Sequence, residues 1–260
     1  MIESHPVVFL GAGPGDPELI TVKGQQALGR ADLVLYAGSL VSPAVLGWTH
    51  PAAELVDTAP LNLEEITTRL AAGYRAGKRV VRVHSGDVSL FSAMQEQLEV
   101  LDREGVPYRV IPGVTAAAAA AAALAQELTL PEVTQTVILT RAAGRTPVPE
   151  RESLDRLAAH RASLVIYLSI SLLEQVTAHL LTAYPPETPV VVAYRVSWPD
   201  ERFIVGTLAT IAGLVAEAGV TRQALIMVSP ALGARHRGLE ARSRLYDAGF
   251  SHGCRSGDTD

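Results

Sequence analysis

The chain has 260 residues, of which 48% are hydrophobic and 19% are charged, so it is long and apolar enough to bury a full core. Its formal net charge of −5 argues against a general nucleic-acid-binding protein. The N-terminus lacks a signal-peptide pattern, no apolar run reaches about 18 residues, and Cys254 is the single cysteine. These features predict a cytoplasmic protein with no membrane span and no internal disulfide.

Short β-branched runs alternate with longer helical patterns through the first half of the chain. This alternation predicts a mostly parallel sheet with helices on its faces. The expected strands lie at 7–10, 33–36, 79–84 and 108–111, and the expected helices at 18–29, 64–76 and 90–104. Gly77 and Gly105 follow two of these helices and are expected to form their C-caps.

Pro112 and Gly113 interrupt the alternation, and an eight-alanine helix follows, which either fills space or lets a ligand approach its backbone. The pattern then resumes, with expected strands at 136–140, 164–168, 190–194, 203–206 and 225–228 and expected helices at 153–160, 171–183 and 208–218. We therefore expect two α/β domains with mostly parallel sheets, at 1–111 and 112–232. A small-molecule site is expected in the cleft between them, and a polar tail covers 233–260.

The loop after the first strand, Gly11–Pro17, reads Gly-Ala-Gly-Pro-Gly-Asp-Pro. Its three alternate glycines let the backbone pass close to a flat or bulky group, and two prolines stiffen it. Asp16 stands where the dinucleotide-binding fingerprint has its third glycine, and the Gly-Lys-Ser/Thr of a phosphate-binding loop is missing. The loop therefore favours a ligand that does not lead with phosphate; the alternative is a tight turn that binds nothing.

Three more glycine-containing loops follow expected strands, at 36–39, 84–90 and 111–116. In open parallel sheets, ligands bind beyond the carboxyl ends of the strands, so four such loops predict a ligand site. Asp87 could accept hydrogen bonds from ribose hydroxyls or an ammonium group, or it could cap a helix starting at Ser89. Asp16 has the same two interpretations, and His84 is either a base or a satisfied polar residue at a strand end.

Motifs for covalent or metal-assisted catalysis are missing from the sequence. It contains no Gly-x-Ser-x-Gly, no His-Glu-x-x-His and no paired cysteines, and its seven histidines are scattered. We therefore expect no metal site, and a reaction that mainly needs two ligands held in line.

Taken together, the loops resemble the tetrapyrrole (uroporphyrin/precorrin-type) methyltransferase family over residues 5–232. The motifs that carry the resemblance are 8–17 with 19–21, Ser85-Gly86-Asp87, and 111–116. The segments 35–41, 134–141, 243–247 and 250–252 are similar to the branch that methylates C-11 of precorrin-4 or its cobalt counterpart. One departure is Val88, where many relatives have proline.

The resemblance implies the tetrapyrrole methylase fold, S-adenosyl-L-methionine as methyl donor, a precorrin-type tetrapyrrole substrate, a homodimer and a role in cobalamin biosynthesis. It implies neither a nucleic-acid nor a membrane partner. The implied donor contacts are Pro14, Ser85, Gly86, Asp87, Leu90, Thr115, Ala116, Leu168, Val196, Ala224 and Leu225. The implied substrate contacts are Gly13, Gly15, Tyr36, Ser39 and Arg141. Asp16 is the catalytic candidate, which either places the loop or accepts pyrrole N–H bonds.

A sulfonium methyl group is already activated, so orientation is the main task, and it can supply roughly 7–11 kcal/mol. A macrocycle fringed with carboxylates also needs local cations on a protein of negative net charge. The candidates are Arg82, His84, Arg141, Arg145, Arg195 and Arg202. The alternatives are a family member acting at another ring position, on diphthamide or on ribosomal RNA, a nicotinamide-dependent oxidoreductase, and a non-enzymatic binding protein for an anionic ligand.

Overall fold

The computed structural model describes residues 5–239, 243 and 248–256. The expected tail motif at 244–247 lies outside the described residues. Within them, the chain forms two compact units: the first contains the chain up to Ala120 together with Arg195–Glu201, and the second contains the remainder. No helix in this described part is long and apolar enough to cross a bilayer.

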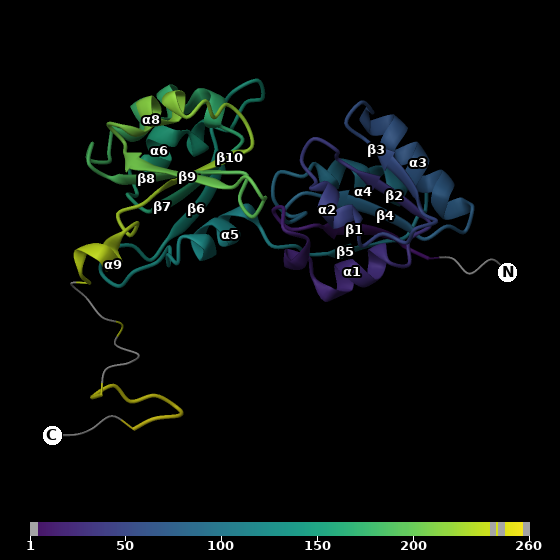
Figure 1. Ribbon diagram of the computed structural model, residues 1–260, viewed down its shortest axis with the longest axis horizontal. Helices are drawn as coiled ribbons and strands as arrows, with labels where there is room; N and C mark the ends of the chain where they lie inside the picture. The colour runs from purple at the N-terminus through teal and green to yellow at the C-terminus, as the bar shows by residue number, and fades with distance from the viewer. Residues whose placement is uncertain (1–4, 240–242, 244–247, 257–260) are drawn as a thin grey trace. The chain divides into compact units, whose positions relative to one another are not determined.

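The first unit is built on a five-stranded sheet in the order β3-β2-β4-β1-β5, with every pairing parallel (Figure 1). Its strands are β1 (Val7–Gly11), β2 (Leu33–Tyr36), β3 (Glu54–Asp57), β4 (Val80–His84) and β5 (Tyr108–Ile111). The four expected strands are confirmed. The sequence pattern missed β3, because this edge strand is a four-residue run with an acidic residue at each end. Since all strands are parallel, the loops after them meet at one edge.

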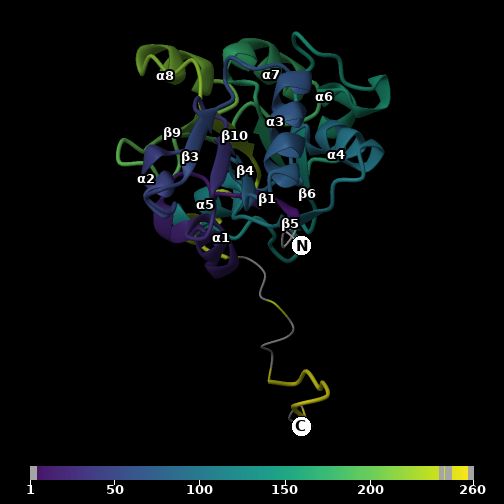
Figure 2. The same ribbon diagram turned by 90° about the vertical axis from the view of Figure 1, so that its right-hand side faces the viewer.

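Alternation of side chains divides the first unit's core between the two faces of the sheet. On one face, Phe9 and Leu35 pack with residues of α3 (Leu63–Arg75) and α4 (Met94–Arg103). On the other, Leu10 and Val34 pack with α1 (Val22–Leu28) and α2 (Pro43–Leu46). Figure 2 shows α3 and α1 on opposite sides of the strands. The short helix α2 was not expected from the sequence.

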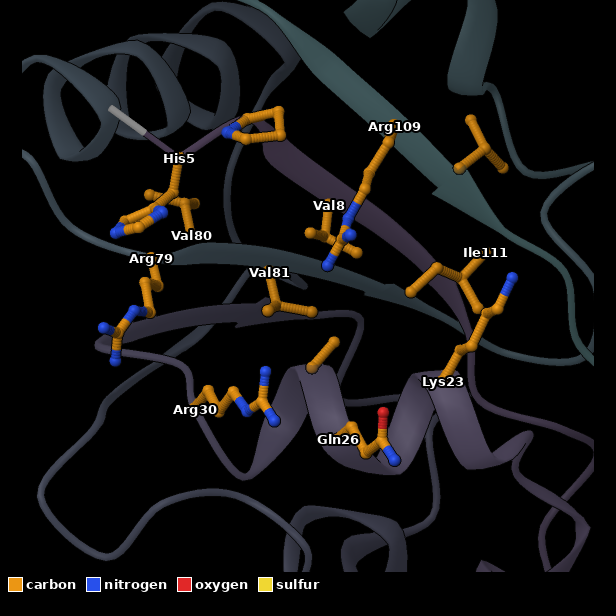
Figure 3. Close-up of a pocket in the computed structure, with 13 residues that line it drawn as sticks. His5, Val8, Lys23, Gln26, Arg30, Arg79, Val80, Val81, Arg109 and Ile111 are labelled. Atoms are coloured by element: carbon orange, nitrogen blue, oxygen red, sulfur yellow. The ribbon is translucent and has the colours of Figure 1, made fainter. Parts of the chain in front are cut away.

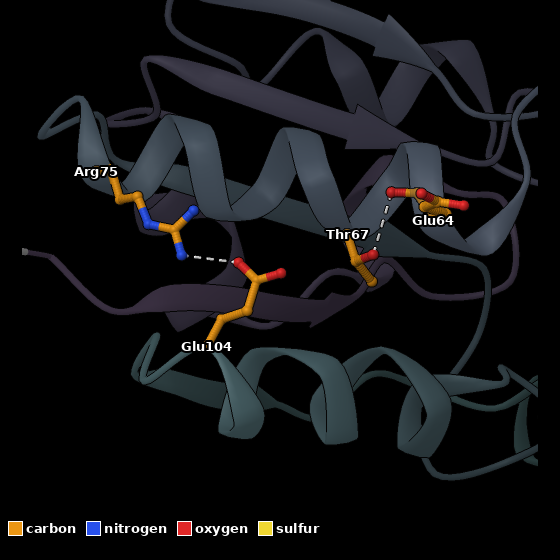
Figure 4. A network of polar contacts seen from close by, with 4 residues as sticks. All are labelled: Glu64, Thr67, Arg75 and Glu104. Atoms are coloured by element: carbon orange, nitrogen blue, oxygen red, sulfur yellow. Dashed lines mark hydrogen bonds and ion pairs between the residues drawn. The ribbon is translucent and has the colours of Figure 1, made fainter.

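Helix α3 begins at a capping box, in which the Asn62 side chain accepts from the Glu65 N–H and the Glu65 carboxylate accepts from the Asn62 N–H, both at 2.9 Å. It ends before Gly77, whose φ of +73° confirms the expected C-cap. At the far end of α3, Arg75 forms a 2.8 Å ion pair with Glu104, which follows α4 (Figure 4). Both side chains are partly exposed, so this pair contributes little to stability.

The second unit has a mixed sheet in the order β6-β7-β10-β8-β9. Its strands are β6 (Val137–Arg141), β7 (Ser163–Tyr167), β8 (Pro189–Tyr194), β9 (Arg202–Thr207) and β10 (Ala224–Val228). Five strands were expected here and are confirmed, but the expectation of mostly parallel pairing was wrong for this sheet. Only β6–β7 is parallel, and the other three pairings are antiparallel. The short connection 195–201 forces β8 and β9 into a hairpin, and apolar runs alone do not encode strand direction.

Helices α6 (Leu154–Ala158), α7 (Leu173–Leu180) and α8 (Ile211–Glu217) pack on the second sheet, against a cluster that includes Leu164, Val192 and Ile226. The eight alanines form α5 (Ala116–Ala123). The remaining elements are the 3-10 helices η1 (Pro17–Leu19), η2 (Glu150–Glu152) and η3 (Ile170–Leu172) and the short helix α9 (Ala234–Arg237), which was not expected. Both units are therefore α/β, as expected.

Candidate functional site

The loops after β1, β4 and β5 meet through their backbones at the carboxyl edge of the first sheet. The Gly13 N–H donates to the Gly86 carbonyl at 3.2 Å, and the Gly86 N–H donates back at 2.8 Å. The Ala12 N–H donates to the His84 carbonyl at 2.8 Å. The loop after β1 and the loop after β4 are thus joined by a short antiparallel bridge between Gly13 and Gly86.

Glycine is required where these loops cross. A Cβ atom on Gly11 would lie 2.6 Å from the Gly113 nitrogen and 2.7 Å from the Gly86 oxygen. A Cβ on Gly113 would lie 2.7 Å from the Gly11 carbonyl carbon. At Gly11, the close approach that the sequence predicted is therefore made by neighbouring backbone, and Gly113 takes part in the same crossing.

Asp87 fastens the β4 loop to the β5 loop. One carboxylate oxygen accepts from the Ser89 N–H at 2.8 Å and from the Ser89 hydroxyl, and the other accepts from the Gly113 N–H at 2.7 Å. Partial burial raises the pKa of Asp87, but these hydrogen bonds outweigh it and hold the pKa below its usual value. The carboxylate is therefore ionised at neutral pH, with about one of its four acceptor positions left over.

One of the two interpretations of Asp87, that it caps a helix starting at Ser89, is wrong, and so is the expected start of that helix. Helix α4 starts at Met94 instead of residue 90, because Phe91 and Ala93 have φ values of +53° and +51°, which a helix cannot contain. The segment between Asp87 and α4 is a loop, and Asp87 closes the turn at its start. Left-handed conformations at two residues with side chains are a form of stored strain that clusters at ligand sites.

The loop Gly11–Pro17 is held by both tryptophans of the chain. Trp198 donates its indole N–H to the Pro14 carbonyl at 2.8 Å, and Trp48 donates to the Pro17 carbonyl at 3.0 Å. The Trp198 ring lies over Gly15, where a Cβ atom would lie 2.5 Å from the indole nitrogen. The flat group that Gly15 approaches is thus a side chain of the protein itself.

Asp16 has two partners at this loop. Its N–H donates to the Ser197 hydroxyl at 2.9 Å, and its carboxylate accepts from the Glu18 N–H at 2.8 Å, which caps η1. Ser197 and Trp198 both belong to the connection 195–201, which is part of the first unit. Arg195 stacks on the Trp198 ring, with its guanidinium carbon 4.0 Å from the ring centroid.

The other predicted residues of the first unit lie on the loops after β1, β2, β4 and β5 or on the connection 195–201. Tyr36 ends β2, and its carbonyl accepts from the Thr58 N–H at 2.8 Å. Ser39 is exposed in the loop that follows, and Asp57 supports that loop by accepting from the Gly38 N–H at 3.0 Å. Half-buried positions at this edge are Ser85, Gly86, Leu90, Thr115 and Ala116, whereas Gly13, Pro14, Gly15 and Val196 are buried.

Two predicted cations, Arg82 and His84, are not at the mouth of any site but under α3 and α4. Arg82 is 5% exposed and donates to Gln97 Oε1 and Thr58 Oγ1, both at 3.1 Å. Burial lowers its pKa to about 10, so it stays charged at neutral pH. His84 is stacked on Phe9, and its Nε2 has no hydrogen-bond partner among the described residues. Burial, with a contribution from the Arg82 charge, lowers the pKa of His84 to about 3, so it is neutral.

The predicted residues of the second unit gather at one edge of its own sheet. Arg141 ends β6 and pairs with Tyr167 of β7, after which Leu168 is exposed at a φ of +55°. Ala224 begins β10, and Leu225 beside it is buried. Because β10 runs antiparallel to β7, the start of β10 lies at the same edge as the end of β7.

The Arg141 guanidinium donates hydrogen bonds to carbonyl groups of its own loop. Its two terminal nitrogens donate to the carbonyls of Ala142, Thr146 and Pro147, at 3.3, 3.1 and 2.6 Å. A substrate carboxylate would have to compete with these bonds.

Sequence reasoning missed Trp48, Asp57, Ser197 and Trp198 as residues that support the site. Trp198 and Pro14 are 184 positions apart in the chain, and no local pattern connects them. One signal was available. Of the two tryptophans in the sequence, Trp198 lies in a Trp-Pro-Asp segment between two expected strands.

Known proteins are similar to this chain in sequence and in fold. The family model of tetrapyrrole (corrin/porphyrin) methylases matches residues 6–212. A precorrin-4 C(11)-methyltransferase of Pseudomonas aeruginosa is 50% identical over 252 residues, which cover 97% of this chain and 99% of the relative.

Two solved structures give the same result. The X-ray structure of a cobalt precorrin-4 methyltransferase, a cobalamin biosynthetic enzyme, matches with a TM-score of 0.85 and 46% identity, covering 87% of this chain and 95% of that one. The uroporphyrin-III C-methyltransferase of Thermus thermophilus, solved with S-adenosylhomocysteine, matches with a TM-score of 0.74 and 30% identity, covering 87% and 93%. The expected fold is confirmed.

Proposed function

The chain belongs to the tetrapyrrole methylase family, and we propose that it transfers a methyl group from S-adenosylmethionine to C-11 of precorrin-4 or cobalt-precorrin-4 in cobalamin biosynthesis. The observation that carries this proposal is the 45–50% identity to precorrin-4 and cobalt-precorrin-4 C(11)-methyltransferases over nearly the whole chain. The other classes considered, an oxidoreductase or a binding protein, have no comparable support.

The rim of the first sheet has the groups that a sulfonium nucleoside needs. S-adenosylmethionine supplies an activated methyl group, so the protein needs neither a nucleophile nor a metal to prepare it. Asp87 is ionised and keeps one acceptor position, which suits a ribose hydroxyl or the ammonium group of the donor. We assign donor binding to the Asp87 loop with Pro14, Thr115 and Ala116. Leu168, Val196, Ala224 and Leu225 remain donor contacts proposed from the resemblance.

The loop Gly11–Pro17 is proposed to bind the tetrapyrrole through its backbone. Two tryptophan N–H groups and the Ser197 hydroxyl hold this loop, so its conformation exists before any ligand binds, which favours orientation of the reacting carbon. Asp16 already caps η1 with one oxygen, and its other oxygen is proposed to accept pyrrole N–H bonds. Gly13, Gly15, Tyr36 and Ser39 complete this surface in the proposal, and Arg141 is proposed to pair with a carboxylate of the substrate.

The proposal includes two further properties. We expect a cytoplasmic homodimer, as the resemblance implies, and light scattering of the purified protein would measure its mass in solution.

The decisive experiment is product analysis. The purified protein is incubated with S-adenosylmethionine carrying a ¹³C-labelled methyl group and with enzymatically prepared precorrin-4, with and without inserted cobalt. We expect a product one methyl group heavier, with the label at C-11 by NMR. A label at another ring carbon would reassign the chain to a sister activity, and no labelled product from either substrate would refute the proposed function.

A further inference from the structure

A cavity of the first unit is lined mainly by residues that lie outside the glycine loops. It has a volume of about 860 Å³ and opens on the α1 side of the sheet. Two of its lining residues, Pro6 and Arg79, directly precede β1 and β4, so they lie at the edge opposite the motif-bearing loops. Nothing in the proposed methyl transfer uses this pocket.

Its rim is basic on a protein whose net charge is −5. Lys23 comes from α1, Arg30 follows α1, Arg79 precedes β4, and Arg109 lies in β5 (Figure 3). Among the described residues, none of these four forms an ion pair, and no aspartate or glutamate lines the pocket. The Asp32 carboxylate accepts from the Arg79 backbone N–H at 2.8 Å, but it is not part of the lining. Four cations on one cavity whose lining contains no carboxylate favour an anionic ligand.

The placement of the cations indicates what kind of anion fits. Figure 3 shows Arg109 reaching from β5 over Val8 and Val81, with Arg30 and Lys23 at separate places on the α1 side and Arg79 apart from them. Groups spread in this way match several separated negative charges better than a single one. The floor between them is made of valine, alanine and isoleucine side chains, which suits an apolar ligand body.

Carboxylates fit this lining better than phosphates. Protein phosphate sites use glycine-rich loops and helix N-termini as backbone donors. The described lining contains no glycine, and Arg30 lies beyond the C-terminal end of α1, where the helix dipole is negative. Three guanidinium groups match carboxylates in bidentate geometry, as they do phosphates, so the missing backbone donors are what favours carboxylates. The volume is in the range of pockets for organic molecules.

We propose that this pocket binds an organic polycarboxylate with an apolar body, at a site separate from the rim of glycine loops. The inference does not depend on the proposed function, although the proposed substrate belongs to the same chemical class. A chain with both sites binds two polycarboxylates, one at each edge of its first sheet.

The test counts binding sites with coproporphyrin III, a fluorescent tetracarboxylate. Wild-type protein in low-salt buffer is titrated by fluorescence and calorimetry, beside the double variant Arg30→Gln/Arg109→Gln and the control Arg222→Gln, which removes an exposed arginine of the second unit. We expect two sites in the wild type and the control. In the double variant, one site should weaken at least about tenfold, and added salt should weaken the wild-type pocket site similarly.

Each other outcome overturns the inference. If the double variant binds the probe as the wild type does, at every site and with the same affinity, the pocket does not bind the probe. ATP that binds the pocket in place of coproporphyrin III would assign it to phosphates. If the double variant differs from the wild type in its mass in solution but keeps both binding sites, the pocket is a contact between copies of the chain. Labelled methyl transfer is measured in parallel, and its rate should be unchanged in the double variant, so failure of the proposed function is detected separately.

Discussion

Asp87 shows how one side chain can serve both the fold and a ligand. Its carboxylate joins Ser89 to Gly113 and so holds two loops at the rim together. These bonds keep it ionised, because protonation would remove a charge that three donors stabilise. The sequence predicted that a carboxylate would stand at this edge, since it follows a strand and a glycine. It did not predict the partner, because Gly113 is 26 positions away.

The two aspartates of the rim are expected to separate donor binding from substrate binding. Asp87→Asn should weaken S-adenosylhomocysteine about tenfold in calorimetry, because an amide loses the charge-assisted bonds to Ser89 and Gly113. Asp16→Asn keeps the cap on η1, since asparagine caps as well as aspartate. It should therefore leave donor affinity within about twofold and raise the KM for the tetrapyrrole by tenfold or so. The reverse pattern, or equal effects of both variants on both ligands, would contradict the assignment.

At the scale of elements, the connection 195–201 matters more than its length suggests. It joins β8 to β9 of the second unit, yet its contacts place it in the first. Ser197 and Trp198 hold the loop Gly11–Pro17 by two hydrogen bonds and by packing on Gly15. Strands β8 and β9 follow from their β-branched runs. The contact of their connection with a loop about 180 positions earlier could not be predicted without the tertiary structure.

Trp198→Phe tests this contact while keeping an aromatic ring over Gly15. Loss of the bond to the Pro14 carbonyl should lower the free energy of unfolding by about 1 kcal/mol in urea titrations. It should also raise the KM for the tetrapyrrole more than it changes kcat. Trp48→Phe is the matched control, since it removes the same kind of bond, to Pro17, from a more exposed ring. Equal effects of the two variants on KM would argue against a special role for the connection.

For the molecule as a whole, sequence patterns predicted elements better than their arrangement. Nine of the ten strands in the described part of the chain follow from β-branched runs, whereas the exposed strand β3 lacks such a run. The direction of the strands in the second sheet depends on which runs pair, and the sequence does not state this. The burial of Arg82 was unpredictable for a similar reason. A charged residue in a strand is expected at the surface, and here Gln97 and Thr58 supply the hydrogen bonds that make burial tolerable.

Buried His84 should make global stability sensitive to acid. It is neutral in the native state down to a pKa of about 3, whereas the unfolded chain protonates it below about 6.5. The stability that it contributes is therefore present above about pH 6.5 and is lost as the pH falls toward 3. We expect the free energy of unfolding of the wild type, minus that of His84→Phe, to fall by roughly 1 kcal/mol per pH unit between pH 6.5 and 4.5. Carboxylates titrate in both proteins and cancel, so a difference that does not change with pH would refute the assignment.

Both indole groups of this protein touch the same short segment, through the carbonyls of Pro14 and Pro17. Since the sequence contains no other tryptophan, its tryptophan fluorescence, excited at a wavelength that the seven tyrosines do not absorb, reports on the immediate surroundings of that segment. A compound that settles on the segment should change the intensity or the wavelength of this emission, so occupancy can be followed in real time by stopped-flow mixing without attaching a dye. Replacing each tryptophan in turn by phenylalanine then shows whether the change in emission comes from the Pro14 end or the Pro17 end of the segment.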